Sequence, residues 1–476
     1  MRKPLALVAV TLALVVAGCS ANKGTSNDAS PQKPDGNRNL IDTKEDNTST
    51  FALDVDTASY TYAAQQITNG GYPDPSQIRP EEFINYFEQS YREPSGDGFA
   101  VHVDAAKFPS GHAQSSNSRL LRVGLQTRGE EGEERLDANL TFVIDVSGSM
   151  AERGRLDLVQ DALHYLVDQL RPTDAVAIVT FNDRARIARE MTRVSNKERL
   201  HTAIDSLSAG GSTNLGEGIV TAYQLARDSF RQGATNRVIL LSDGLANTGT
   251  TSSDALLSKI RGEADKEISL LGVGVGSEYG DELMEQLADK GDGFVVYISE
   301  RQQARDLFVK KLPATLAIRA YDAKAQVIFN RSTVDSYQLI GYENRLIADK
   351  EFRDNRVDGG EVGPGHSVTA LYVVKLREGA QGQVAQVRVR WLDPKDRSAD
   401  EKSVSIKADE FGDSFNSTDA TFKLTYVAAF FAESLRRKPS APLSQLLEIA
   451  REAEPELDNA AVRQLIELID KMQRRG

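Results

Sequence analysis

Short apolar runs alternate with amphipathic segments between residues 139 and 316. Each apolar run is continuous, as in strands buried on both faces, and each amphipathic segment repeats its apolar residues at helical spacing. This alternation predicts an α/β domain with a doubly wound, mainly parallel sheet that carries helices on both faces. The expected strands cover residues 139–144, 175–181, 186–190, 238–241, 268–275 and 294–298. The expected helices cover residues 156–170, 196–207, 215–230, 253–264, 281–290 and 302–312.

A second pattern occupies residues 317–412, where apolar and polar positions alternate with a period of two between turns rich in Gly, Asp and Pro. This pattern predicts an antiparallel β module. Two further strand-like runs, residues 99–105 and 120–126, precede the α/β domain and have no neighbouring strands of their own. We therefore expect them to pair into the module and to complete a β-sandwich. The strands expected within the module are residues 325–329, 337–342, 367–376, 384–391 and 403–407.

The regions on either side of these two modules are less regular. Residues 413–476 hold three amphipathic helical patterns, at 419–436, 443–453 and 458–473. Their Phe, Leu and Ile spacing is that of ordinary core packing, so no functional site is assigned to them. Residues 51–138 form a separate N-terminal region that contributes the two strand-like runs.

The first residues have the pattern of an export signal. Arg2 and Lys3 precede an apolar run over residues 5–17, which is shorter than the ~20 residues that span a bilayer. The run leads to Cys19, the single cysteine of the chain, in a sequence that resembles a bacterial lipoprotein signal. Residues 1–18 are therefore expected to be removed, and Cys19 is expected to carry a lipid that anchors the protein permanently to a membrane.

Residues 19–50 are rich in Ser, Asn, Thr, Lys, Asp and Pro and contain almost no apolar side chains. Such a segment buries too little surface to offset the entropy of ordering, so it is expected to be a disordered tether. The net charge of −12 and the absence of a basic, aromatic patch make nucleic acid a poor partner. Ser20 follows Cys19 at the position where an Asp would favour inner-membrane retention in Gram-negative bacteria. For such a host the resemblance to lipoproteins therefore implies the outer membrane, facing the periplasm or the surface.

Oxygen-bearing side chains follow the ends of two predicted strands. Asp145 ends the first strand of the α/β domain, and Ser147 and Ser149 follow it at alternate positions. A Gly-rich loop places Thr213 at the start of a helix, and Asp243 ends a further strand. Ligand sites of open α/β sheets lie beyond the carboxyl ends of the strands, so we expect these side chains to converge there. All-oxygen ligation suits a hard cation such as Mg²⁺, with Mn²⁺ or Ca²⁺ as alternatives, and suits Zn²⁺ poorly.

Helix capping is the simpler explanation for each of these residues taken alone. Ser and Asp at strand ends often accept hydrogen bonds from the free N–H groups of a following helix. Ser212 or Thr213 could cap the helix that begins near Asn214, and Asp243 could hold the turn at Gly244. Capping does not, however, explain why all of these residues occur in one chain at these positions.

As a set, these residues resemble the metal-ion-dependent adhesion site of the von Willebrand factor type A fold. The resemblance covers Asp145, Ser147, Ser149, Thr213 and Asp243, in order and each on the expected element. It implies that the two Ser hydroxyls bind the metal directly and that the Thr hydroxyl does so directly or in one state only. The two Asp carboxylates would bind directly or through water. An Asp or Glu carboxylate of a protein ligand would complete the coordination sphere.

Longer segments resemble the bacterial type A lipoproteins of the YfbK type. They are residues 53–60, 84–87, 339–345 and 360–372, so the resemblance covers nearly the whole mature chain. It implies a cell-envelope protein with an adhesion-type metal site and no known catalytic activity.

Two other functions remain as alternatives to metal-dependent protein binding. The first is an envelope scaffold or assembly factor whose metal site only stabilises the fold. The second, less favoured, is a metal-dependent hydrolase. A phosphatase of the haloacid dehalogenase type needs a second Asp two residues after the first, where this chain has Ser147. Asp54 and Asp56 have that spacing, but no alternating α/β pattern surrounds them.

Overall fold

The computed structural model describes residues 40–475, apart from residues 54–56, 97, 113–115, 130–135, 244–261, 263–267, 277–286, 288–294, 299–300, 306, 309–318, 356, 358, 395, 413 and 437–440. The helices predicted at 253–264 and 281–290 fall almost entirely outside the described residues. Residues 1–39, which include Cys19, also lie outside them.

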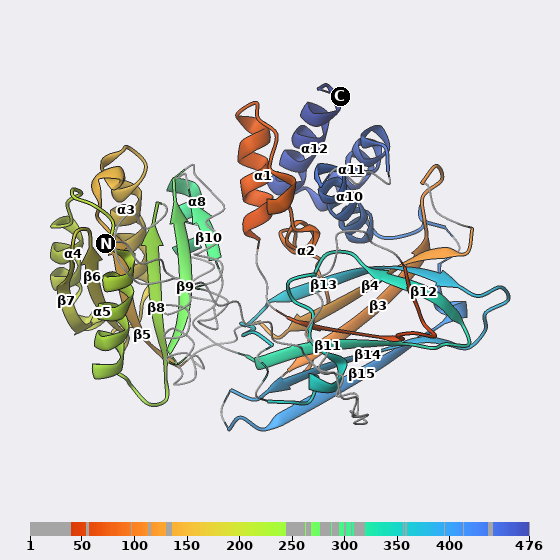
Figure 1. Ribbon diagram of the computed structural model, residues 1–476, viewed down its shortest axis with the longest axis horizontal. Coiled ribbons are helices and arrows are strands. Elements are labelled where there is room, and N and C mark those ends of the chain that lie inside the picture. Colours follow the sequence, from red (N-terminus) through yellow and green to blue (C-terminus); the bar gives the residue numbers. More distant parts are fainter. Residues whose placement is uncertain are drawn as a thin grey trace, which may run out of the picture. The chain divides into compact units, whose positions relative to one another are not determined.

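The α/β domain contains a sheet with the strand order β10–β9–β8–β5–β6–β7 (Figure 1). All neighbouring strands are parallel except β6 and β7, which pair antiparallel, so the predicted mainly parallel sheet is confirmed. The edge strand β7 runs beyond the predicted 186–190. The strands are β5 (Asp137–Asp145), β6 (Ala175–Phe181), β7 (Ala185–Arg193), β8 (Ala234–Ser242), β9 (Ile268–Val275) and β10 (Val295–Ile298).

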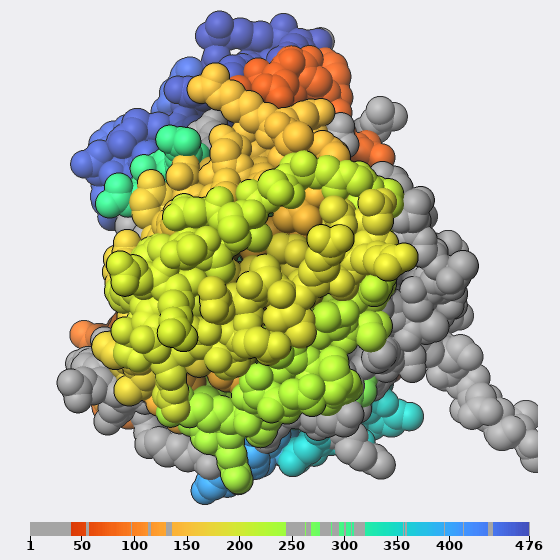
Figure 2. All heavy atoms as spheres, turned by 90° about the vertical axis from the view of Figure 1, so that its left-hand side faces the viewer, coloured from red at the N-terminus to blue at the C-terminus, as the bar shows by residue number. Residues whose placement is uncertain are grey.

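Helices cover both faces of this sheet. Phe142 of β5 belongs to the core formed with α3 (Leu156–Gln169) and α4 (Lys197–Asp205). The next residue, Val143, belongs to the opposite core, which is formed with α5 (Leu215–Asp228). Successive side chains of a strand point to opposite faces, and both faces are buried here, which explains the continuous apolar runs. Of the helix expected at residues 302–312, the structure describes α8 (Arg301–Arg305). In the space-filling view, segments of the α/β domain coloured yellow to light green form most of the visible face (Figure 2).

Two antiparallel sheets form the β-sandwich, with the strand orders β1–β12–β13–β4–β3 and β15–β14–β11–β2. The two strands that precede the α/β domain are β3 and β4, and β4 pairs with β13 over nine residues. Side chains from both sheets share one apolar core. The first sheet contains β1 (Ile41–Asp42), β3 (Phe99–Lys107), β4 (Ser118–Thr127), β12 (Val334–Leu339) and β13 (Ser367–Leu376). The second contains β2 (Thr48–Ala52), β11 (Tyr321–Phe329), β14 (Gln383–Leu392) and β15 (Ala399–Lys407).

The ordered sandwich begins earlier than the predicted boundary at residue 51. Residues 40–50, which their composition placed in a disordered tether, contribute β1 and the first part of β2, and β2 pairs with β11. Their polar side chains find partners: the Thr43 hydroxyl donates to the Val334 carbonyl (2.7 Å) and the Thr50 hydroxyl donates to Asp349 (2.6 Å). Composition alone underestimated this segment because ladder hydrogen bonds do not require apolar side chains.

Five described helices pack on the outer face of the first sandwich sheet (Figure 1). Their shared core includes Leu120 of β4 and Leu371 of β13, whose side chains point away from the sandwich interior. Nearly all residues of α10 are buried, as in a central helix that is covered on every side. No described helix is long and apolar enough to cross a membrane. The helices are α1 (Ala58–Thr68), α2 (Pro80–Asn85), α10 (Ala420–Leu435), α11 (Leu443–Leu457) and α12 (Ala460–Gln473).

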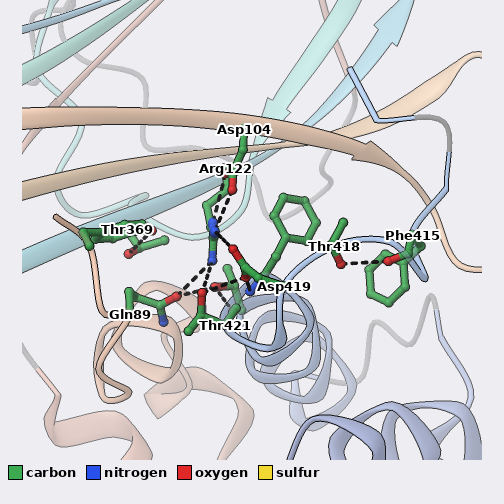
Figure 3. A network of polar contacts seen from close by, with 11 residues as sticks. Gln89, Asp104, Arg122, Thr369, Phe415, Thr418, Asp419 and Thr421 are labelled. Atoms are coloured by element: carbon green, nitrogen blue, oxygen red, sulfur yellow. Dashed lines mark hydrogen bonds and ion pairs between the residues drawn. The ribbon is translucent and has the colours of Figure 1, made fainter. Parts of the chain in front are cut away.

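A buried arginine joins the sheet to these helices (Figure 3). Arg122 of β4 is 3% exposed, and its Nε and Nη2 donate to Asp104 of β3 (3.0 and 2.6 Å). Its Nη2 also lies 3.2 Å from Asp419, and its Nη1 donates to Thr421 (2.9 Å). Asp419 is the N-cap of α10, where it accepts a hydrogen bond from the Phe422 N–H. One cation therefore holds both a strand pair and the start of the central helix.

Candidate metal centre

Asp145 ends β5 and is fully buried at the carboxyl end of the sheet. Its Oδ1 accepts a hydrogen bond from the Ser147 N–H (2.8 Å), and its Oδ2 accepts one from the Ser242 hydroxyl (2.8 Å). Burial raises the pKa of Asp145. The hydrogen bonds from Ser147 and Ser242 act against this shift, and the Asp243 carboxylate adds to it. Both donors are neutral, so a cation bound here would stabilise the ionised carboxylate.

The two Ser side chains connect Asp145 to the second carboxylate. Ser147, 1% exposed, is followed by the 3-10 turn Gly148–Ala151, which brings Ser149 back towards it. The Ser147 and Ser149 hydroxyl oxygens lie 3.1 Å apart. The Ser149 hydroxyl donates to Oδ1 of Asp243 (3.0 Å), which directly follows β8. Four of the five predicted ligands thus form one connected cluster.

The Gly-rich loop that carries Thr213 is bound to the same turn. The Gly148 N–H donates to the Gly211 carbonyl (2.9 Å), and the Gly210 N–H donates to the Val146 carbonyl (2.8 Å). Thr213 follows these contacts, is 4% exposed, and directly precedes Asn214 at the start of α5. The structure therefore places Thr213 in the loop that borders the Ser147–Ser149 turn.

The N-cap of α5 is Asn214 and not Ser212 or Thr213. The Asn214 side chain accepts the hydrogen bond from the Glu217 N–H (3.3 Å). The Ser212 N–H and hydroxyl both donate to Asp183 (2.9 and 2.5 Å). Neither of the two hydroxyl residues that precede Asn214 is needed to cap this helix.

Two residues of the site were not predicted from the sequence. Ser242 directly precedes Asp243, and its hydroxyl donates to Oδ2 of Asp145. A hydroxyl next to Asp243 at the end of β8 is a signal that the sequence does offer. Arg155, 13% exposed, forms a short ion pair with Oδ2 of Asp243 and donates to the Ser149 carbonyl (3.2 Å). No sequence signal singles out Arg155, because its position depends on the irregular backbone at the start of α3 (φ −114°, ψ −91°).

The donor set fits a hard divalent cation. Mg²⁺ holds its oxygen ligands at about 2.1 Å in octahedral geometry, so neighbouring ligands lie about 3.0 Å apart. The Ser147–Ser149 and Ser149–Asp243 oxygens are joined by hydrogen bonds of 3.1 and 3.0 Å, a spacing that two neighbouring ligands of one Mg²⁺ would also have. Among the described residues, no group of three or more His, Cys, Asp or Glu side chains could hold a metal ion. The candidate site therefore depends on its hydroxyls as well as its two carboxylates.

Three family models match different parts of the chain. The family model for the von Willebrand factor type A domain matches residues 139–310, and that for the C-terminal part of the uncharacterized protein YfbK matches residues 314–474. A third, named von Willebrand factor, matches residues 30–120.

Individual relatives cover different shares of the chain. YfbK of Escherichia coli is 31% identical over 455 residues, 88% of this chain and 78% of that protein. Human inter-alpha-trypsin inhibitor heavy chain H3 is 25% identical over 218 residues, 44% of this chain and 24% of that protein. Among solved structures, a von Willebrand factor type A protein from Catenulispora acidiphila is similar over 78% of this chain and 89% of that chain (17% identity, TM-score 0.47).

Proposed function

Because the chain belongs to the YfbK family of von Willebrand factor type A domain proteins, we propose that its type A domain binds a protein ligand through a metal ion. The metal would be Mg²⁺, with Mn²⁺ or Ca²⁺ as alternatives, held by Asp145, Ser147, Ser149, Thr213 and Asp243. The observation that carries the proposal is the connected cluster of Ser147, Ser149 and Asp243 oxygens, which lie 3.1 and 3.0 Å apart.

Neutral hydroxyls explain why such a site would bind a carboxylate. Ser147 and Ser149 donate little negative charge, so a metal that they hold keeps much of its affinity for anions. Asp145 and Asp243 supply the balancing negative charge from buried positions. An Asp or Glu side chain of the ligand would enter the remaining coordination position. The chain itself provides the binding geometry, and the bound metal supplies the attraction for the carboxylate.

Binding accounts for the residues of the site better than hydrolysis does. Both oxygens of Asp145 already accept hydrogen bonds, and Asp243 is occupied by Ser149 and Arg155. Ser147 stands where a phosphatase of the haloacid dehalogenase type would place its second Asp. The proposal therefore gives neither carboxylate of the cluster the role of a general base. We propose a non-enzymatic protein.

The location of the protein is part of the same proposal. Residues 1–18 would be cleaved, and a lipid on Cys19 would hold the protein in the cell envelope. For a Gram-negative host we propose the outer membrane, facing the periplasm or the surface.

Crosslinking and co-purification from native membranes test the proposal. The experiment compares the wild type with Asp145→Asn, and with the wild type in chelator. Asp228→Asn serves as the matched control, since Asp228 is an exposed carboxylate on α5 of the same domain. Loss of the same partners with Asp145→Asn and with chelator, and their retention with Asp228→Asn, would support metal-dependent binding. Retention of every partner in all samples would favour the scaffold alternative.

A further inference from the structure

Arg155 places a positive charge directly against the candidate metal centre. Its guanidinium contacts Oδ2 of Asp243 in a short ion pair, while the other oxygen of Asp243 faces Ser149. The same Nη1 donates to the Ser149 carbonyl (3.2 Å). The Asp243 side chain is 4% exposed and that of Arg155 is 13% exposed, so water screens this pair only weakly. Arg155 thus engages the carboxylate that a bound metal would also use.

The Arg155 side chain has two further neighbours, Gly276 and the exposed acid Glu152. Gly276, which follows β9 with φ +100°, lies beside the Arg155 side chain, and a Cβ at this position would come within 3.3 Å of Arg155 Nε. Arg155 Nη2 lies 2.9 Å from Glu152, whose side chain is 69% exposed. The guanidinium therefore lies between a buried acid of the site and an exposed acid at its rim.

We propose that Arg155 is an internal counter-cation of the metal centre, which holds Asp243 in the metal-free protein and withdraws towards Glu152 when Mg²⁺ binds. This inference rests on the proposed function, since it describes the regulation of the same site. Two cations that share one carboxylate repel each other, so Mg²⁺ binding must weaken the Arg155–Asp243 pair. Arg155 would lower the affinity for Mg²⁺ and keep the empty site folded.

Removing the charge should therefore raise the affinity for Mg²⁺. Arg155→Met removes the charge and keeps an unbranched apolar stem, and Arg153→Met is the matched control, because it removes the same charge from an exposed position two residues away. Calorimetric titration with Mg²⁺ should give an affinity about tenfold higher for Arg155→Met than for Arg153→Met, within the usual range of coupling between two ligands. The metal-free Arg155→Met protein should also melt at a lower temperature, because Asp243 loses its partner, and Mg²⁺ should raise its Tm more than that of the wild type.

Arg155→Lys provides a second readout, because it keeps the positive charge but replaces the planar guanidinium with an ammonium group. Its Mg²⁺ affinity should stay closer to the wild type than to Arg155→Met. If the wild type binds Mg²⁺ and Arg155→Met binds it with equal or lower affinity, the counter-cation proposal is wrong and the proposed function stands. If the wild type gives no Mg²⁺ binding at millimolar concentration, the proposed function fails and the regulation inferred from it fails with it.

Discussion

Replacing Arg122 with Met should lower the free energy of unfolding by about 2–3 kcal/mol. Hydrogen bonds to charged groups contribute about 1.5–3 kcal/mol each, and removing one partner of a fully buried ion pair costs about 3–5 kcal/mol. The loss should be smaller than for a fully buried ion pair, because the two acidic partners, Asp104 and Asp419, are 45% and 54% exposed. Water can therefore solvate both carboxylates once the guanidinium is removed. Met keeps an unbranched apolar stem but loses the guanidinium that lies over the rings of Tyr91 and Phe422.

Urea unfolding followed by tryptophan fluorescence measures this effect locally. Trp391 is the single tryptophan of the chain, and it packs against Phe99 of β3 with ring centroids 5.3 Å apart. Its emission therefore reports on the sandwich that contains Arg122. Arg474→Met is the control, since Arg474 is 77% exposed and pairs with Asp470 one turn earlier on α12. Such a surface pair contributes about 0.5 kcal/mol or less. A loss below about 1 kcal/mol for Arg122→Met would refute the argument that this buried cation joins sheet and helices.

Three smaller perturbations test other parts of the account. Burial raises the pKa of Asp419, but Arg122 and the Phe422 N–H lower it by more, so the pKa lies below its usual value. The ionised carboxylate therefore stabilises the fold above about pH 4, and this stabilisation is lost as the pH falls below that value. Urea unfolding between about pH 2 and 5 should therefore show a weaker pH dependence for Arg122→Met than for the wild type. Ser242→Ala leaves Oδ2 of Asp145 without its donor and should cost about 1–2 kcal/mol of thermal stability in metal-free buffer, with a smaller cost when Mg²⁺ is present. Asn214→Ala removes the N-cap of α5 and should cost about 1 kcal/mol, whereas a neutral effect in thermal unfolding would contradict the assigned cap.

The fold class could be predicted because both modules follow simple periodicities. The strand that ends at Asp145 reads as a continuous apolar run since it has a neighbouring strand on each side and a helical core on each face. The period-two pattern identified the sandwich, and the missing local partners of residues 99–105 and 120–126 pointed to its remaining strands. The ordered residues 40–50 could not be predicted in this way, because a polar segment such as Thr48–Ala52 becomes a strand only through its pairing with β11.

The candidate site could be predicted only in part, for a related reason. Asp145 and Asp243 follow neighbouring parallel strands, so their proximity is a consequence of the sheet. Ser147 and Ser149 lie close to Asp145 in sequence, and the short turn between them fixes their separation. Arg155 reaches Asp243 only because the chain turns irregularly before α3 and because Gly276 leaves room for its side chain. Such contacts depend on tertiary geometry that no short-range pattern encodes.

Mg²⁺ titration of the wild type and of Ser147→Ala by calorimetry tests the central claim most directly. Ser147 is 1% exposed and its hydroxyl lies 3.1 Å from that of Ser149, so the substitution removes one oxygen with little change in packing. We predict one Mg²⁺ per chain in the wild type and an affinity at least about tenfold weaker in Ser147→Ala, with similar thermal unfolding of the two metal-free proteins. Equal Mg²⁺ affinity in both proteins, or no binding to the wild type, would contradict the assignment of this site.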